Sequence, residues 1–285
     1  MAYFKWPNGA RLAVSLVVNI EEGAEENIRD GDRGPEPVDE LQVALGKPVR
    51  NYGNESNYQY GIKAGAPRVL RLLQQAGIKA TFTAAALALE RAPDVAKGIV
   101  AGGHEVCAHG YRWTSQHRFD EEKEREFIVK AIESIKKTTG DRPHGWLCRY
   151  LLTDNTRRLL VENGFTYHMD DYSDDVPFWD VVDGKPIVIV PYALDTNDMK
   201  MWMAPAYTPS DWEKYVCDTF DELYAESAEA PKMMSVGVHL RIIGRPGRIG
   251  QLRRFIEHAA RKPGVWFATR KEIADCFASQ VKAPK

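Results

Sequence analysis

Short apolar runs, rich in β-branched residues, alternate with amphipathic stretches along this whole chain, and that alternation constrains the fold more than any other feature. Amphipathic helices between apolar strands are typical of a parallel sheet covered by helices. Each run is flanked by Gly, Pro, Asp or Asn. The seven predicted strands are Leu12–Ile20, Ile78–Thr83, His104–Ala108, Phe165–Met169, Ile187–Val190, Met234–His239 and Val265–Thr269. Seven or eight such strands suit an α/β barrel, and because no linker interrupts the pattern, we expect a single domain over residues 1–285.

Three of the intervening stretches carry clear helix signals. The spacing of apolar residues predicts helices over Pro67–Gln75, which Gly77 would end, and over Phe119–Thr138. A third helix is expected after Thr208, with Ser210 as its N-cap and Glu213 completing a capping box.

Residues Glu21 to Ala64 do not follow this pattern. The stretch is polar and rich in glycine, and it is far longer than the usual connection of about 4–6 residues. Connections of that length are normally lids or binding loops, so we expect this one to border a site.

Composition excludes several classes of partner. The 285 residues include 38 Lys and Arg against 40 Asp and Glu, with no basic block, so the chain lacks the electrostatic surface of a nucleic-acid or anionic-membrane binder. Its longest N-terminal apolar stretch, Leu12 to Val18, is too short to span a bilayer, and no secretory cleavage pattern follows it. Four widely spaced cysteines suggest reduced thiols. We therefore expect a cytoplasmic protein that acts on a small molecule.

Chemically active side chains stand at the ends of three predicted strands and of the apolar run HGWLC. They are Asn19, Glu21, Glu22, His109, Arg149 and His239. In an α/β barrel these strand ends face one mouth, where such folds place their active sites. Adjacent residues of a strand point in opposite directions, so at most one of Glu21 and Glu22 should enter the pocket fully. The alternative for this pair is an acidic turn on the surface.

The spacing of histidines argues against a metal site. A short-spaced pair such as H-x3-H would help to complete a metal's coordination, but the residue four after His109 is Trp113, which cannot bind a cation. His117 remains as an alternative ligand if its loop folds back. The other histidines stand in contexts typical of structural residues: His104, His144, His168 and His258. Catalysis without a metal, by a carboxylate that activates water, is therefore favoured.

Two tracts that mix acids, amides and aromatic residues suit the wall of a polar pocket. They are Tyr167–Trp179 and Pro191–Trp202, although ordinary surface loops are the alternative. The substrate-binding candidates are Trp113, Arg149, Asp171, Asp195 and Asn197. The segment Arg241–Phe255 has no phosphate-loop spacing and is interpreted as a loop and a helix start.

Several long segments resemble the polysaccharide deacetylase superfamily, and within it the branch of metal-independent bacterial allantoinases and cyclic-imide hydrolases. The segments are Trp6–Glu25, GIKATFTAAA, Gly102–Trp113, NTRRLLVENGFTYHMDDYSDDVPFW, YALDTNDM, HLRIIGRPGRI and GVWFATRKEIA. The resemblance implies a distorted (β/α) barrel and a homo-oligomer, either a tetramer or a dimer. It places the family's late catalytic histidine at His239 and its first acidic motif at Glu21 and Glu22. Trp113 stands where metal-dependent members carry a second histidine. Gly145–Thr156 and Leu240 depart from the branch's pattern, which leaves the exact substrate open.

These observations lead to one favoured function and two alternatives. The favoured function is cofactor-free hydrolysis of a cyclic amide, imide or ureide such as allantoin. Glu21 or Glu22 would deprotonate water, His239 would protonate the leaving nitrogen, and His109 with Arg149 would orient the substrate or balance the oxyanion.

The first alternative is N-deacetylation of an amino sugar or peptidoglycan fragment with a divalent ion, such as zinc, on Glu22, His109 and perhaps His117. The second is an inactive barrel that only binds a carbohydrate or a metabolite.

Overall fold

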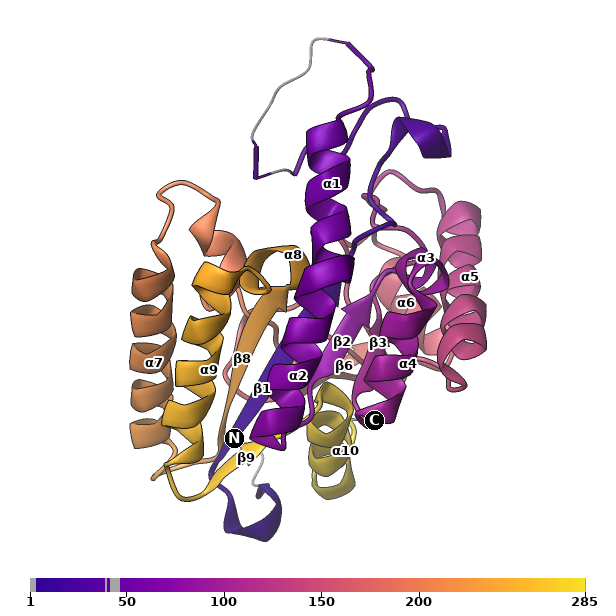
Figure 1. Ribbon diagram of the computed structural model, residues 1–285. Coiled ribbons are helices and arrows are strands. Elements are labelled where there is room, and N and C mark those ends of the chain that lie inside the picture. The colour runs from indigo at the N-terminus through magenta and orange to yellow at the C-terminus, as the bar shows by residue number, and fades with distance from the viewer. Residues whose placement is uncertain (1–3, 39, 42–46, 285) are drawn as a thin grey trace.

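A curled nine-stranded sheet forms the centre of the computed structural model, which describes residues 4–38, 40–41 and 47–284 (Figure 1). The strands are β1 (Leu12–Ile20), β2 (Thr81–Ala84), β3 (Glu105–Ala108), β4 (Gly145–Trp146), β5 (Tyr167–His168), β6 (Phe178–Val182), β7 (Lys185–Ile189), β8 (Lys232–His239) and β9 (Val265–Phe267). Their order is β6-β7-β5-β4-β3-β2-β1-β8, and β9 pairs with the start of β1. Every pair is parallel except β6 with β7. The expected barrel is therefore confirmed as a half-barrel.

Each of the seven predicted runs overlaps a strand, but two strands were missed. β4 has only two residues, too few for a period-2 pattern. β6 and β7 form a hairpin around Asp183 and Gly184, which both have positive φ angles. An Asp-Gly pair between apolar runs is a strong hairpin signal, so the sequence did carry this information. The predictions also placed Ile78, His104 and Phe165 inside strands, whereas each of them precedes its strand.

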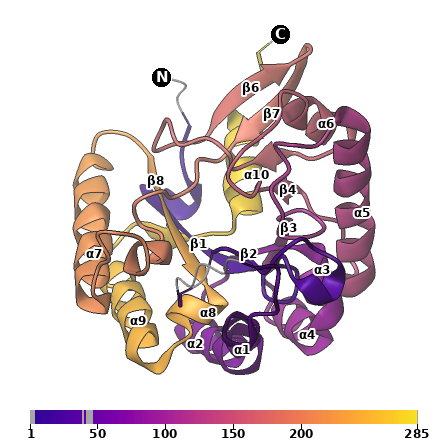
Figure 2. The ribbon, with the colours of Figure 1, turned by 90° about the horizontal axis from the view of Figure 1, so that it is seen from above.

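The helices surround the sheet on its outer side, as Figure 2 shows from above, except the last one, Arg270–Gln280, which packs on the inner side of the curl. They are α1 (Tyr52–Tyr60), α2 (Ala66–Ala76), α3 (Ala86–Arg91), α4 (Pro93–Ala101), α5 (Glu121–Thr139), α6 (Thr156–Glu162), α7 (Pro209–Glu226), α8 (Leu240–Ile243), α9 (Pro246–Ala260) and α10 (Arg270–Gln280). None of the helices within the described ranges is long and apolar enough to cross a membrane.

The helix ends follow local chemistry. Gly77 ends α2 in the left-handed conformation, as predicted. The predicted cap of α7 was wrong, because Thr208 rather than Ser210 is the N-cap and Asp211 rather than Glu213 completes the capping box. Pro209 explains this start, since proline suits the first helical position, where no N–H is needed.

The expected loop from Glu21 to Ala64 is in part a helix. Its first part is irregular, residues 39 and 42–46 lie outside the described residues, and α1 follows from Tyr52. A π-helical turn, Gly61–Gly65, joins α1 to α2. A methyl group on Gly61 would overlap the Glu22 carboxylate, and one on Gly65 would overlap the Leu240 carbonyl. These two glycines let the helix approach the carboxyl ends of β1 and β8.

The alternation along β1 decides which side chains face the inside of the half-barrel. Leu12, Val14, Leu16, Val18 and Ile20 belong to the core beneath the helices. Ala13 and Val17 belong to a second, inner core that also contains residues of β3, β5, β7 and α10. Asn19 continues this inner series, and Glu21 follows it at the carboxyl end of the strand. The sequence alternation therefore directs Glu21 inward and Glu22 toward the helices.

Candidate active site

Three of the four predicted catalytic side chains meet at the carboxyl ends of β1, β3 and β8. Glu21 Oε1 lies 3.6 Å from His109 Nε2 and 3.3 Å from His239 Nε2. All three side chains are at least nine-tenths buried. Two imidazoles therefore face one carboxylate oxygen in a site that is largely shielded from solvent.

His239, the last residue of β8, is held by a second carboxylate. Its Nδ1 lies 2.7 Å from Asp198 Oδ1, while Asp198 Oδ2 accepts the backbone N–H groups of His239 and Ile243. Burial acts to lower the pKa of His239, but the carboxylates of Glu21 and Asp198 outweigh it and raise this pKa to about 9. At neutral pH His239 is therefore a cation that carries a proton on Nε2.

His109 is oriented by a backbone carbonyl. Its Nδ1 lies 2.7 Å from the oxygen of Leu147, and because a carbonyl only accepts, Nδ1 carries the hydrogen. Nε2 is therefore the ring nitrogen that faces Glu21 Oε1. His239, which carries a proton on Nε2, is suited to donate a hydrogen bond at the same carboxylate oxygen.

Arg241 is the cation closest to Glu21. Its Nη1 lies 2.6 Å from Glu21 Oε2, and the side chain is completely buried. Burial alone would raise the pKa of Glu21, but Arg241 and then His239 hold it well below its usual value. Glu21 therefore stays ionised throughout the neutral range.

Glu22 orients its neighbours and is directed away from the two histidines. Its Oε2 accepts the backbone N–H of Glu21, and its Oε1 accepts that of Arg241, both at 3.0 Å. Burial raises the pKa of Glu22. The two adjacent acids thus point in different directions, as expected for neighbours at a strand end, and Glu21 is the one that faces the two histidines.

Arg149 lies beside the site, but its charge is already balanced. Both of its Nη atoms donate to Glu36, at 2.9 and 2.5 Å, and one of them also donates to the Trp113 carbonyl. Its guanidinium stacks 3.9 Å from the centre of the Trp113 ring. Arg149 therefore connects the loop after β1 to the barrel, and these contacts compete with the predicted role of orienting the substrate or balancing the oxyanion.

Trp113 also forms part of an aromatic enclosure around Arg241. The guanidinium carbon of Arg241 lies 4.4 Å from the ring centre of Tyr58, and 5.4 Å from those of Trp113 and Trp202. These rings come from α1, from the loop after β3 and from the segment before α7. The expectation that Trp113 lines the site agrees with this position.

Two predicted binding residues lie outside this cluster, and a third supports it indirectly. Asp171 pairs with Arg157 at 3.3 Å, and Asp195 is exposed and accepts from the Tyr215 hydroxyl. Asn197 caps a short 3-10 turn, Asp198–Met201, and donates to the Tyr192 hydroxyl.

Local contacts explain these positions. Asp171 is the neighbour of the buried residue Asp170, whose carboxylate accepts the backbone N–H of Cys148. Burial raises the pKa of Asp170 to about 7. Asp195 precedes the buried residue Asp198 by three positions. In both tracts the acid that faces the protein interior is a near neighbour of the one predicted.

Sequence reasoning missed Arg241, Asp198, Glu36, Tyr58 and Asp170. The interpretation of Arg241–Phe255 as a loop and a helix start was wrong for Arg241, which belongs to the site. Its position two residues after His239 was a usable signal. No spacing rule pairs Glu36 with Arg149, which follows it by 113 residues.

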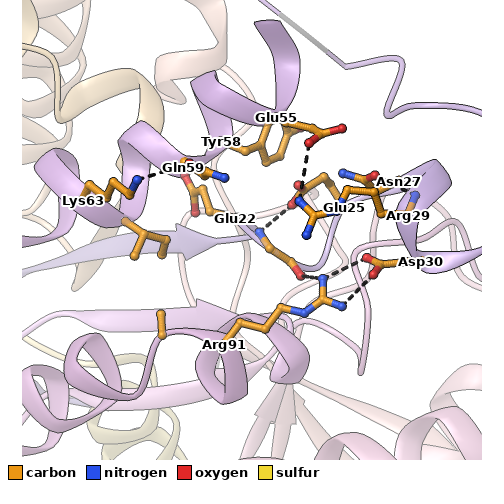
Figure 3. A pocket seen from close by; sticks show the side chains of 13 residues that line it. Glu22, Glu25, Asn27, Arg29, Asp30, Glu55, Tyr58, Gln59, Lys63 and Arg91 are labelled. Atoms are coloured by element: carbon orange, nitrogen blue, oxygen red, sulfur yellow. Dashed lines mark hydrogen bonds and ion pairs between the residues drawn. The ribbon is translucent and has the colours of Figure 1, made fainter. Parts of the chain in front are cut away.

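A cavity of about 400 Å³ opens on the other side of Glu22 (Figure 3). Glu25, Arg29, Glu55 and Tyr58 line it together with Glu22. Most of its cations are paired, as Arg29 is with Glu55 at 3.6 Å. The cavity reaches the back of the acidic pair, and the two histidines are not among its lining residues.

The ligand set of the metal-dependent alternative is not assembled. His117 is exposed and accepts from the Arg118 Nε, and both Glu22 oxygens accept backbone N–H groups. Within residues 4–38, 40–41 and 47–284, no three His, Cys, Asp or Glu side chains form a group that could hold a metal ion. Of the histidines predicted to be structural, His104 accepts the Ala80 N–H at Nδ1, and His258 pairs with Asp221.

Comparisons with known proteins identify the relatives of this site. The sequence profile described as Polysaccharide deacetylase matches residues 56–168. A Schizosaccharomyces pombe protein named as a candidate polysaccharide deacetylase is 36% identical, with 96% of this chain and 92% of that protein covered. The crystal structure of PuuE allantoinase superposes with a TM-score of 0.93 at 44% identity, covering 98% of this chain and 94% of that one. A Helicobacter pylori peptidoglycan deacetylase is 27% identical over 75% of this chain and 84% of its own length.

Proposed function

This chain belongs to the polysaccharide deacetylase family, and we propose that it hydrolyses the C–N bond of a cyclic amide, imide or ureide, with allantoin as the first substrate to test. The observation that carries the proposal is the placement of Glu21 Oε1 between the Nε2 atoms of His109 and His239. Support also comes from the similarity to PuuE allantoinase along nearly the whole chain.

Glu21 is the base in this proposal. It is ionised at neutral pH, and its inward position suits a water molecule that donates a hydrogen bond to Oε1 within reach of His109 Nε2. The water oxygen attacks the ring carbonyl carbon while its proton passes to Glu21. Glu22 acts through the backbone of Glu21 and is a positioning residue.

His239 is the acid. Its raised pKa keeps the Nε2 proton available at neutral pH. When the tetrahedral intermediate collapses, the C–N bond breaks and the nitrogen takes this proton. The proton held by Glu21 then restores His239, which lies 3.3 Å away. The balance is one water consumed, one carboxylic acid formed and one N–H gained.

A divalent metal does not fit this set of donors. The family includes metal-dependent enzymes, so the test is whether Glu21, His109 and His239 can serve as ligands. The Arg241 guanidinium already lies 2.6 Å from the Glu21 carboxylate, and a second cation would be repelled by this fixed charge. The position four after His109 holds the non-ligating Trp113. We therefore propose that no metal takes part.

The deacetylase alternative is supported by the named Helicobacter pylori and Schizosaccharomyces pombe relatives. It requires a divalent ion, held by Glu22 and His109 with or without His117, to polarise an unstrained acetamide. An inactive binding barrel is the less favoured case, because the proton-bearing His239 and the ionised Glu21 are both in place. We also propose a small-molecule substrate, a cytoplasmic location and a dimeric or tetrameric assembly.

Hydrolysis assays on purified protein separate these functions. Allantoin, succinimide, hydantoin, dihydrouracil and an acetylated amino sugar are each incubated with enzyme, with and without excess chelator, while metal content is measured. We expect turnover of at least one ring by metal-free enzyme. Acetate release that requires stoichiometric zinc, with no ring opened, would replace the proposal by the deacetylase function.

A further inference from the structure

Arg241 presents hydrogen-bond donors that the described part of the chain leaves unused. Its Nε, Nη1 and Nη2 atoms are buried and have no hydrogen-bond partner among the described residues. Nη1 forms an ion pair with Glu21 Oε2 at 2.6 Å, whereas Nε and Nη2 donate to neither acid of the site. Buried donors are almost always satisfied, so each unsatisfied one requires an explanation such as a water or a ligand.

The surroundings fix this cation without using up its donors. The rings of Tyr58, Trp113 and Trp202 enclose the guanidinium, and aromatic faces attract a cation while accepting no conventional hydrogen bond. The backbone is held as well, because Arg241 N donates to Glu22 Oε1. The side chain is thus preorganised beside the base, in a place that water reaches poorly.

We propose that Arg241 is the electrophilic residue of the site, which binds the substrate carbonyl oxygen and stabilises the oxyanion that forms on it. The inference rests on the proposed function and assigns the group that polarises the carbonyl. Water attacks from the side of Glu21 Oε1, and the carbonyl π electrons move onto the oxygen, where the guanidinium donates to it. The charge returns to the carbonyl when the C–N bond breaks.

A fixed cation at this place explains how the site works without a metal. Preorganised donors in a water-excluded site stabilise a developing charge far better than donors in water. Trp113 contributes in two ways. It occupies the position where metal-dependent members carry a second histidine, and its ring packs against Arg241. The donors of Arg149, by contrast, are largely committed to Glu36 and to the Trp113 carbonyl.

The test compares Arg241→Ala with Arg245→Ala in the wild-type background. Arg245 is a matched control, since its guanidinium lies 3.7 Å from the Tyr60 ring and donates to Asn57, away from the two histidines. We expect R241A to lose about 10²–10³-fold in kcat with a smaller change in KM. Millimolar guanidinium should restore part of that loss, and Arg241→Lys should retain more activity than R241A. R245A should stay within about threefold of wild type.

The outcomes keep this inference separate from the proposed function. If the wild type opens no ring but releases acetate from acetylated sugars, the proposed function fails, and the same comparison is made on acetate release. If it turns over neither, binding of acetate and of succinamate is measured by calorimetry. Each carboxylate imitates the oxyanion, so R241A should bind at least tenfold more weakly than wild type and R245A should not.

Activity of R241A within threefold of wild type would overturn the inference, and so would equal carboxylate binding by R241A and wild type. R241A could lose activity without guanidinium rescue because the protein no longer folds, which its melting temperature would show. In that case R241K, which keeps the charge, decides between misfolding and the loss of the electrophilic group. A folded R241K no better than R241A, again without guanidinium rescue, would also count against the assignment.

Discussion

Replacing Asp198 by Asn should move the alkaline limit of activity toward lower pH. In the proposed mechanism His239 is the acid, so we expect kcat/KM to fall as pH rises through its pKa of about 9 in the free enzyme. Asp198 is one of the two carboxylates that raise this pKa, and its Oδ1 lies 2.7 Å from Nδ1. In Asp198→Asn that negative charge is lost while the size of the side chain is kept.

The magnitude follows from the contact. Burial pulls the pKa of His239 down, yet the value lies above the ordinary 6.5, so the two carboxylates together supply more than the net rise. A unit charge at about 4 Å is worth up to about 4 kcal/mol at an effective dielectric of 20, and one pKa unit corresponds to about 1.4 kcal/mol. Since the Asn oxygen still accepts a hydrogen bond, we expect a shift of about 1–2 pH units.

The assay is the dependence of kcat/KM on pH between about 6 and 10.5 for wild type and D198N. The matched control is Asp221→Asn, because Asp221 pairs with the surface residue His258 at 2.9 Å. That variant should reproduce the wild-type profile. An alkaline limit unchanged in a folded D198N would refute the role of His239 as the titrating acid.

The unfolding free energy should also fall as His239 loses its proton at alkaline pH. A histidine whose pKa is raised by folding stabilises the folded state fully below pH 6.5, and that contribution is lost as pH rises through about 9. The unfolding free energy of wild type should therefore decline over this window by more than that of D198N, as measured by urea denaturation at several pH values.

Three further predictions follow from the same contacts. Glu21→Gln should lower kcat by about 10²–10⁴-fold while ring substrates still bind, as measured by steady-state kinetics and calorimetry, and near-normal turnover would exclude Glu21 as the base. Glu36→Gln should lower the unfolding free energy in urea by about 3 kcal/mol, because it leaves Arg149 charged and buried without its partner, whereas a change below about 0.5 kcal/mol would contradict that view. Excess chelator should leave wild-type turnover unchanged within about twofold, and chelator-sensitive activity restored by zinc would contradict the metal-free reading.

The periodicity of the sequence determined much of this protein's fold, because it reflects the local geometry of strands and helices. Alternation along β1 separates an inner from an outer face, and this alone directs Glu21 inward and Glu22 outward. Carboxyl ends of parallel strands meet at one edge, so His109 and His239 could be placed near Glu21 before any coordinates. The half-barrel and the chief catalytic candidates were therefore predictable.

Contacts between distant segments were decided only by the tertiary structure. The partnership of Asp198 with His239 spans 41 residues, and that of Glu36 with Arg149 spans 113. The rings around Arg241 come from three separate parts of the chain. No local period encodes which acid of a polar tract turns inward, because packing against other elements selects it. The sequence predicted which strand ends hold the proposed catalytic residues. The tertiary structure determined which partner residues set the charge of each one.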